Sequence, residues 1–222
     1  MIAMWKPYCW KFSILCLSIV ALVASAKNDG NPANEVVDCI NKNRTTNKLP
    51  KLYNSPGLGC MALQYISECM GNCSTNNTLS CQPPEVDITE VYAPNCGVEL
   101  PTVGTISGHL VGCQWKHLNP EQAFSKVLIS DKKRLSLLHS KDHTEVGVGF
   151  SRAHHGPFFW CILFSSGKTN STFVLEGGRG IKQRNGCFSG KDLPCSSGRK
   201  LPFPSDLKPV VFSMLLHLIV GI

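Results

Sequence analysis

The chain has 222 residues, of which 43% are hydrophobic and 17% charged, and its formal net charge is +7. Its Lys and Arg residues form no block of five or more, and no aromatic stripe is interleaved with them. This pattern excludes nucleic acid as an expected partner.

The first 26 residues have the three parts of a secretory signal peptide. Lys6 and Lys11 precede an apolar run, Phe12–Ala24, which ends in the small-residue triplet Ala24-Ser25-Ala26. The alternative is an uncleaved anchor helix, but the run is shorter than the roughly 20 residues that a bilayer span needs. We therefore predict cleavage after Ala26.

Two amphipathic helices are predicted next. Val36, Val37 and Ile40 share one helical face, with Asn34 as the expected cap and Pro50 as the end. A second helix, ending near Gly71, is indicated by apolar residues at positions i, i+3, i+4, i+7 and i+8, namely Leu58, Met61, Ala62, Tyr65 and Ile66. The following stretch, 72–103, is rich in Cys, Pro, Asn and Thr and is expected to be irregular and tied by disulfides.

A third helix is predicted over Glu121–Ile129, after the helix-starting pair Asn119-Pro120. The "RLSLL" segment that follows is expected to form a short helical turn. An apolar, uncharged stretch, "PTVGTISGHLVG", precedes this helix.

The segments "EVGVGFS" and "FFWCILFSS" are predicted to form a β-hairpin joined by the loop "RAHHGP". Val146, Val148 and Phe150 point to one side of the first strand, and Gly147 and Gly149 to the other. Two interpretations are open: an active-site strand with room for a ligand, or a core strand. We favour the core strand, in which the glycines allow a neighbouring element to approach closely.

The C-terminal region has the pattern of a glycosylphosphatidylinositol (GPI) anchor signal. Three small residues, Ser196-Ser197-Gly198, are followed by a polar, Pro-containing spacer and an apolar tail, Val210–Ile222. We predict Ser196 as the ω site, with a tail-anchoring helix as the alternative. The section 172–196 is expected to be loop-rich, and its "EGGRG" motif is interpreted as a turn because it opens no helix.

The predicted mature chain, Lys27 to Ser196, has 170 residues with 17 basic and 14 acidic side chains, which suits one domain. It keeps ten cysteines, and an even number in a secreted chain predicts five disulfides of unknown connectivity. These are Cys39, Cys60, Cys69, Cys73, Cys81, Cys96, Cys113, Cys161, Cys187 and Cys195. Cys69 and Cys73 are close in sequence, but no second pair completes a zinc site.

Four Asn-x-Ser/Thr sequons predict N-glycosylation at exposed positions. They are Asn43, Asn72, Asn76 and Asn170. The middle residue of the second is Cys73, and a disulfide there could hinder glycan transfer.

The order of several motifs resembles the CAP superfamily, the cysteine-rich secretory, antigen 5 and pathogenesis-related-1 proteins, especially its bacterial-type branch. The motifs are "INKNR" with "LPKL" (40–52), "SDKKRLSLL" (130–138) and "TEVGVGF" through "FFWCILF" (144–164). With both membrane signals, the chain also looks like the degenerate CAP domains of plant uncharacterised GPI-anchored glycoproteins. The resemblance implies an α+β fold, a disulfide-stapled α-β-α sandwich with a small antiparallel sheet.

Many members of this family have a cleft of two His and two Glu that holds a divalent metal, and this chain departs from that pattern. The family motif has His-Arg where this chain has Lys133-Arg134, and an ammonium group has no lone pair for a metal. No mid-chain Glu-Asn pair is found, and Glu145 beside His143 does not make a tetrad. We therefore expect no metal, no cofactor and no catalytic residue.

Other candidate sites are weaker. His139 and His143, with His154-His155 in the hairpin loop, form a metal or pH-sensing cluster only if the fold gathers them, and solvated histidines are the simpler interpretation. No Gly-x-Ser-x-Gly motif indicates a serine hydrolase, and nothing points to a carboxylate pair for glycoside cleavage.

The predicted organisation is a signal peptide (1–26), a CAP-like extracellular domain (27–171), a disulfide-held C-terminal section (172–196) and a removed anchor propeptide (197–222). We expect a non-enzymatic domain, anchored to the outer leaflet of the plasma membrane, that binds a protein, glycan or lipid. The alternatives are a lipid or sterol carrier that uses the apolar region near residues 82–112, and a residual metal-dependent hydrolase that uses Glu145 with a His.

Overall fold

A computed structural model describes residues 30–98, 106–166, 181–182, 184–191 and 195. The predicted signal peptide, the sequon at Asn170 and the anchor signal from Ser196 onward lie outside these residues. In the part of the chain that is described, none of the helices is both long enough and apolar enough to span a bilayer.

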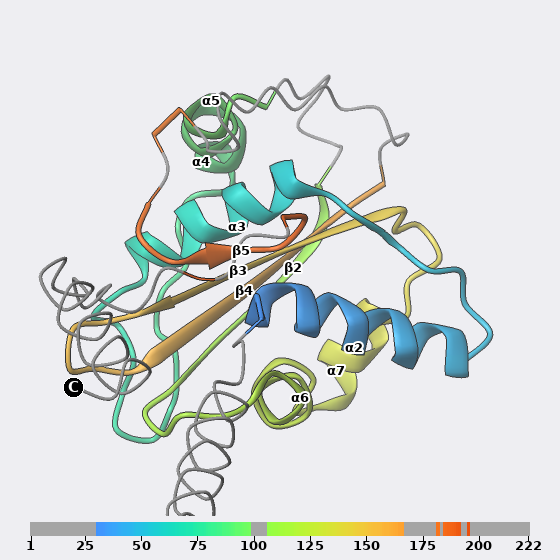
Figure 1. The fold of residues 1–222 in the computed structure, drawn as a ribbon, viewed down its shortest axis with the longest axis horizontal. Helices are drawn as coiled ribbons and strands as arrows, with labels where there is room; N and C mark the ends of the chain where they lie inside the picture. Colours follow the sequence, from blue (N-terminus) through green and yellow to red (C-terminus); the bar gives the residue numbers. More distant parts are fainter. Residues whose placement is uncertain (1–29, 99–105, 167–180, 183, 192–194, 196–222) are drawn as a thin grey trace, which may run out of the picture.

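A five-stranded sheet forms the centre of the fold (Figure 1). Its strands are β1 (Tyr53–Asn54), β2 (Ile106–Gln114), β3 (Glu145–Arg152), β4 (Phe158–Ser165) and β5 (Cys187–Phe188). The order is β1-β3-β4-β2, and β5 also pairs with β3. The predicted hairpin is confirmed as antiparallel β3 and β4, with Val148 opposite Ile162. Strand β2 was not predicted, nor were the short strands β1 and β5, which run parallel and antiparallel to β3.

Helices cover both faces of this sheet (Figure 1). The layer on one face, called the α2 layer below, consists of α2 (Pro32–Thr46), α6 (Pro120–Ala123), the π-helical turn η3 (Phe124–Leu128) and α7 (Lys132–Leu138). The layer on the other face, the α3 layer, consists of α3 (Pro56–Glu68), α4 (Glu85–Asp87), the π-helical turn η1 (Ile88–Tyr92) and α5 (Ala93–Cys96). The predicted α+β class and α-β-α sandwich are confirmed.

The fold has a hydrophobic cluster on each face of the sheet, and side chains that alternate along β3 point into one or the other. Val146, Val148 and Phe150 belong to the cluster on the α2 side. A Cβ on Gly147 would overlap the backbone of Leu58 and Gly59 in α3, and one on Gly149 would lie well under 3.0 Å from the backbone of residues 62 and 63. The prediction of a core strand with glycines for close approach is therefore confirmed.

Helix α2 begins three residues earlier than predicted. Asn31, not Asn34, is its cap, because the Asn31 side chain accepts a hydrogen bond from the Ala33 amide at 3.0 Å. Asn34 lies within the helix, and its Oδ1 accepts hydrogen bonds from Asn54 in β1 and from the Gly190 amide. The polar side chain that looked like a cap therefore connects three segments of the chain.

The stretch predicted as irregular contains a helical run, α4–η1–α5, over residues 85–96. Its buried residues are Ile88, Tyr92, Ala93 and Cys96, whose spacing places them on one helical face against α3. The Tyr92 hydroxyl also donates a hydrogen bond to the Glu68 carboxylate at 2.8 Å. Tertiary packing therefore makes a helix from a segment with two prolines at its start and one inside.

The described residues form four disulfides, and the prediction of five is wrong. The pairs are Cys60–Cys96, Cys69–Cys81, Cys73–Cys113 and Cys187–Cys195. Cys39 and Cys161 are free thiols. They cannot pair because Cys39 packs against the cluster on the α2 side, whereas Cys161 projects from β4 into the cluster on the α3 side.

Candidate functional site

A cleft of about 610 Å³ lies between β2, the edge strand of the sheet, and helix α7. It is lined by residues of β2, of α7 and of the turns at both ends of α7. These are His109, Leu110, Val111, Asp131, Lys133, Arg134, Ser136, Leu137 and Ser140. Its size is within the range of small-molecule sites, and its lining mixes apolar, hydroxyl and charged groups.

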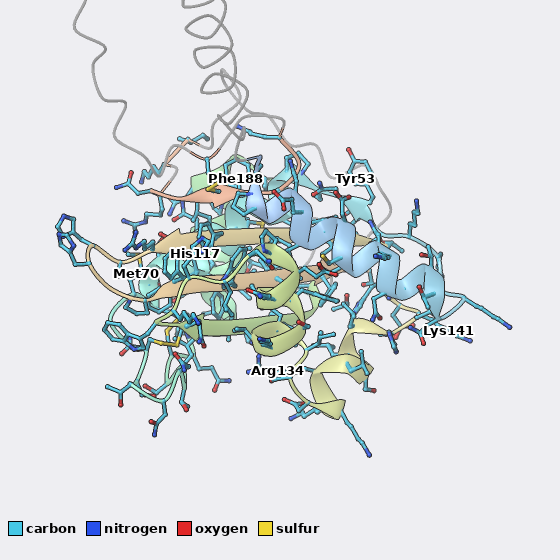
Figure 2. The ribbon with its side chains drawn as sticks, turned by 60° about the horizontal axis from the view of Figure 1, so that its bottom comes forward. Tyr53, Met70, His117, Arg134, Lys141 and Phe188 are labelled. Carbon is cyan, nitrogen blue, oxygen red and sulfur yellow. A yellow bond between two sulfur atoms is a disulfide. The ribbon has the colours of Figure 1, made fainter. Side chains whose placement is uncertain are left out.

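Arg134 holds α7 against the sheet at this cleft (Figure 2). Its Nη1 donates hydrogen bonds to the carbonyl oxygens of Val111 in β2 and Val127 in η3, both at 2.9 Å. Asp131 caps α7 by accepting from the Arg134 amide, and its other oxygen lies 3.3 Å from Nε of Arg134. The Arg134 guanidinium is therefore part of the cleft wall.

Arg44 supports the same region from α2. Its side chain is fully buried, and Nη1 donates to the carbonyl oxygens of Leu138 at 2.7 Å and Ser140 at 2.9 Å. Its Nε donates to the Pro50 carbonyl at 3.0 Å, and burial lowers its pKa. A cation at the C-terminal end of α7 is also favoured by the helix dipole. Arg44 thus fixes Ser140, which lines the cleft.

His143 is buried next to this region and makes hydrogen bonds through both ring nitrogens. Nε2 lies 2.9 Å from the Leu137 carbonyl oxygen, which can only accept, so Nε2 carries a proton. In the neutral ring, Nδ1 then accepts from the Ser107 hydroxyl at 2.7 Å. The ring also stacks on Phe164, with centroids 4.4 Å apart. Burial lowers the pKa of His143, with a smaller effect in the same direction from Arg44.

Glu145, two residues further on, faces the other side of the sheet. Glu145 is on the same side of β3 as Gly147, which contacts α3. His143 instead stacks on Phe164, which belongs to the cluster on the α2 side. The Glu145 carboxylate is hydrogen-bonded to Ser165, and burial raises its pKa. The sheet therefore keeps Glu145 and His143 apart, although they are neighbours in the sequence.

The described residues do not fit the divalent metal cleft that the family resemblance implied. Within residues 30–98, 106–166 and the later described positions, no three His, Cys, Asp or Glu side chains come close enough together to hold a metal ion. Lys133 lines the cleft where the motif has its histidine, and both ring nitrogens of His143 are already engaged.

The other predicted histidines do not gather with His143. Nε2 of His139 lies 2.7 Å from Oδ1 of Asn43 at the end of α2. His154 and His155 stack edge to face on the exposed β3–β4 loop, with ring centroids 4.1 Å apart. His109, which sequence reasoning did not single out, lines the cleft and packs on the ring of Tyr65 at 5.5 Å.

Three of the four predicted glycosylation sites lie in the described chain. Asn72 and Asn76 are exposed, near the Cys73–Cys113 disulfide. Asn43 is partly buried in the last turns of α2, with its Oδ1 at His139. The two exposed sequons lie in the loop after α3, and neither asparagine lines the cleft.

A family model described as "CAP: Cysteine-rich secretory protein family" matches residues 37–164, which is more than half of the chain. The chain belongs to the CAP family. Among solved structures, an outer surface protein from Borrelia burgdorferi is similar, with 13% sequence identity and a TM-score of 0.44. That match covers 60% of this chain and 91% of the other. No curated protein matches the sequence.

Membership of the CAP family, together with the four disulfides, points to an extracellular or cell-surface location for this protein. Disulfides form and persist in oxidising compartments and are rare in the cytosol.

Proposed function

We propose that this protein is a non-enzymatic, GPI-anchored and N-glycosylated cell-surface protein whose CAP domain binds a ligand in the cleft between β2 and α7. The observation that carries the proposal is the cleft itself. It has apolar lining residues from β2 and α7 beside hydroxyl and cationic groups, and buried contacts of Arg44 and Arg134 hold its walls.

The non-enzymatic part of the proposal has a direct test at Ser107 and His143. Their hydrogen bond is of the kind that activates a serine, but the group that orients the His143 ring is the Leu137 carbonyl, not a carboxylate. A fluorophosphonate probe should therefore leave Ser107 unlabelled. Labelling of Ser107 that is lost in His143→Gln would contradict the proposal and favour a serine hydrolase.

GPI anchoring is supported by the sequence at both ends of the chain and by the family's secretory character. In a eukaryotic host, phosphatidylinositol-specific phospholipase C should release the protein from the cell surface. The double variant Leu215→Asp, Leu216→Asp disrupts the apolar tail and should be secreted without an anchor. Wild-type protein that stays on the membrane after phospholipase treatment would instead support a tail-anchoring helix.

Ligand binding in the cleft can be tested by native mass spectrometry of the mature protein after its glycans are trimmed. We expect a noncovalent mass excess in the wild type that is lost in Ser136→Trp, which places an indole at the cleft. Lys132→Trp is the matched control, because Lys132 is exposed on the same helix but does not line the cleft. A mass excess that Ser136→Trp leaves unchanged would contradict the proposed site.

The size of that mass excess also separates the lipid-carrier alternative from the leading proposal. The apolar side chains of Leu110 and Leu137 in the cleft lining are the observation that favours a carrier. A mass excess that matches a lipid or sterol would support it. A clean wild-type mass would exclude a tightly held small ligand and leave a protein or glycan partner.

A further inference from the structure

The two helical layers carry opposite charge. No Lys or Arg occurs between Lys51 and Lys116. The described residues of that interval, which build the α3 layer and β2, contain four acidic residues, Glu68, Glu85, Asp87 and Glu90. Segments 30–51 and 116–142, which build the α2 layer, contain ten basic and five acidic residues. Lys182 and Arg184, which contact α3 and α5, offset part of the acidic charge on that side. The excess of positive charge on the α2 layer steers anions towards that layer.

The cleft opens beside the basic layer. Residues 131–142, which form α7 and its flanking turns, contain four basic side chains and two acidic ones. Lys141 lies at the outer end of this layer in Figure 2. A ligand that approaches the cleft therefore meets an excess of positive charge.

Inside the cleft, Lys133 is the charge without a partner. Asp131 is offset by Arg134, with which it forms the one ion pair found among the described residues. The guanidinium of Arg134 is further engaged by two backbone carbonyls. Lys133 is exposed, lines the cleft and makes no ion pair within the described chain.

The groups around Lys133 define the rest of a ligand. Ser136, on the same helix, and Ser140, in the turn after it, both line the cleft and supply hydroxyl groups. Leu137 and Leu110, whose side chain faces the α2 layer, supply an apolar wall. The side chains thus suit a compact molecule with one anionic group and a small apolar body.

We propose that the cleft binds an organic anion, with Lys133 pairing the carboxylate or phosphate group and Leu137 packing against the apolar body. This inference rests on the proposed ligand-binding function of the cleft and specifies its ligand class. A free metabolite and the end group of a larger molecule share this chemistry, and both would present the same anionic group to Lys133.

The test compares benzoate with benzamide, which has the same shape without the charge. The full chain is expressed in a eukaryotic secretory host, and the mature protein, with Leu and Val methyl groups labelled, is titrated into the tens of millimolar range. Ligands of this size bind with a Kd of about 1–10 mM at ordinary efficiency. The methyl signals of Leu137 and Leu110 report binding in the cleft.

We expect benzoate to bind about fivefold more tightly than benzamide, which is the upper end of what an exposed ion pair contributes. Lys133→Gln should reduce this ratio to about one, whereas Lys132→Gln, the matched control, should keep it. The benzoate preference should also fall as salt is added, because the pair is exposed.

Three other results would each contradict a part of the proposal. Equal binding of both probes to the wild type would overturn the anion inference and leave the ligand-binding cleft standing. Signals of Leu137 and Leu110 that respond to neither probe would overturn the cleft as a small-molecule site as well. A benzoate preference that persists in Lys133→Gln would show that the anion is held by another group.

Discussion

The hydroxyl of Ser107 donates a hydrogen bond to Nδ1 of His143 at 2.7 Å, and this contact joins the start of β2 to the segment that leads into β3. The opposite side of the same ring donates to the Leu137 carbonyl near the end of α7. One buried imidazole therefore connects the two elements that form the walls of the cleft. In the neutral ring, which burial favours, Nδ1 accepts this hydrogen bond from Ser107.

Replacing His143 by Gln should make the stability of the protein less dependent on pH. Burial lowers the pKa of His143 in the folded protein below its ordinary value of 6.5. At a pH between the two pKa values, the unfolded chain therefore binds a proton at His143 that the native protein does not bind. Wild-type stability should therefore fall as the pH is lowered from 8 to 5. His143→Gln cannot titrate, and urea unfolding across this range should show a shallower decline.

His154→Gln is the matched control, because this ring is exposed on the β3–β4 loop. Its unfolding curves should follow the wild type at every pH. A residual slope is expected in His143→Gln, since burial also lowers the pKa of His109. A slope as steep as that of the wild type would mean that His143 does not titrate with folding.

The core of the fold could be predicted because its apolar residues are spaced with the periods of a strand and of a helix. Alternation in "EVGVGF" indicated both faces of β3, and the apolar spacing indicated α2 and α3. Strands β1 and β5 have two residues each, and such short segments hold no period. Helical spacing was present at Ile88, Tyr92 and Cys96, but the nearby prolines and cysteines suggested an irregular segment instead.

The candidate site was harder to predict because its walls are distant in the sequence. His109 in β2 and Ser136 in α7 come together only through the packing of α7 on the sheet edge. Sequence proximity was misleading for His143 and Glu145, which the sheet separates. The charge contrast between the layers was present in the sequence, but its meaning depends on which helices share a face.

Glu145→Gln should stabilise the protein at neutral pH. Burial raises the pKa of Glu145 above 4.5, so folding favours its protonated form. As the pH rises from 4.5 through the folded-state pKa, the unfolded chain loses this proton first, and stability is lost. The variant avoids this loss, and its amide oxygen can still accept the hydrogen bond from Ser165.

Urea unfolding should therefore show Glu145→Gln to be more stable than the wild type at pH 7, with the difference shrinking towards pH 4. Glu121→Gln, an exposed position on α6, should match the wild type at both values. A Glu145→Gln protein that is less stable at pH 7 would indicate that the carboxylate is needed in its charged form.

Gly149→Ala should destabilise the fold severely. The added methyl group would overlap the backbone of Ala62 and Leu63, which cannot move without displacing α3 from the sheet. We expect a loss of at least about 3 kcal/mol, the upper part of the range for overpacked cores, measured by thermal unfolding or by reduced secretion. Gly30→Ala is the control, because its methyl group would meet only the Glu35 carboxylate, at an ordinary 3.4 Å. Equal stability of the two variants would disprove the close contact of β3 with α3.

The two free cysteines predict a specific thiol count. After denaturation without reductant, the mature protein should react with two equivalents of a maleimide, at Cys39 and Cys161. In the native state only Cys39 should react, since Cys161 is fully buried in β4. The reaction should be slow at pH 7 and faster at pH 9, because burial and, to a smaller degree, the charge of Glu121 raise the pKa of Cys39.

Cys39→Ser should remove the native reaction and leave one thiol after denaturation, and Cys161→Ser should leave the native reaction unchanged. Peptide mapping would then show the four pairs of the structure. No reactive thiol in the denatured wild type would mean that Cys39 and Cys161 are both oxidised. Because the sheet lies between these side chains, that result would require either a rearranged disulfide pattern or pairing with another molecule.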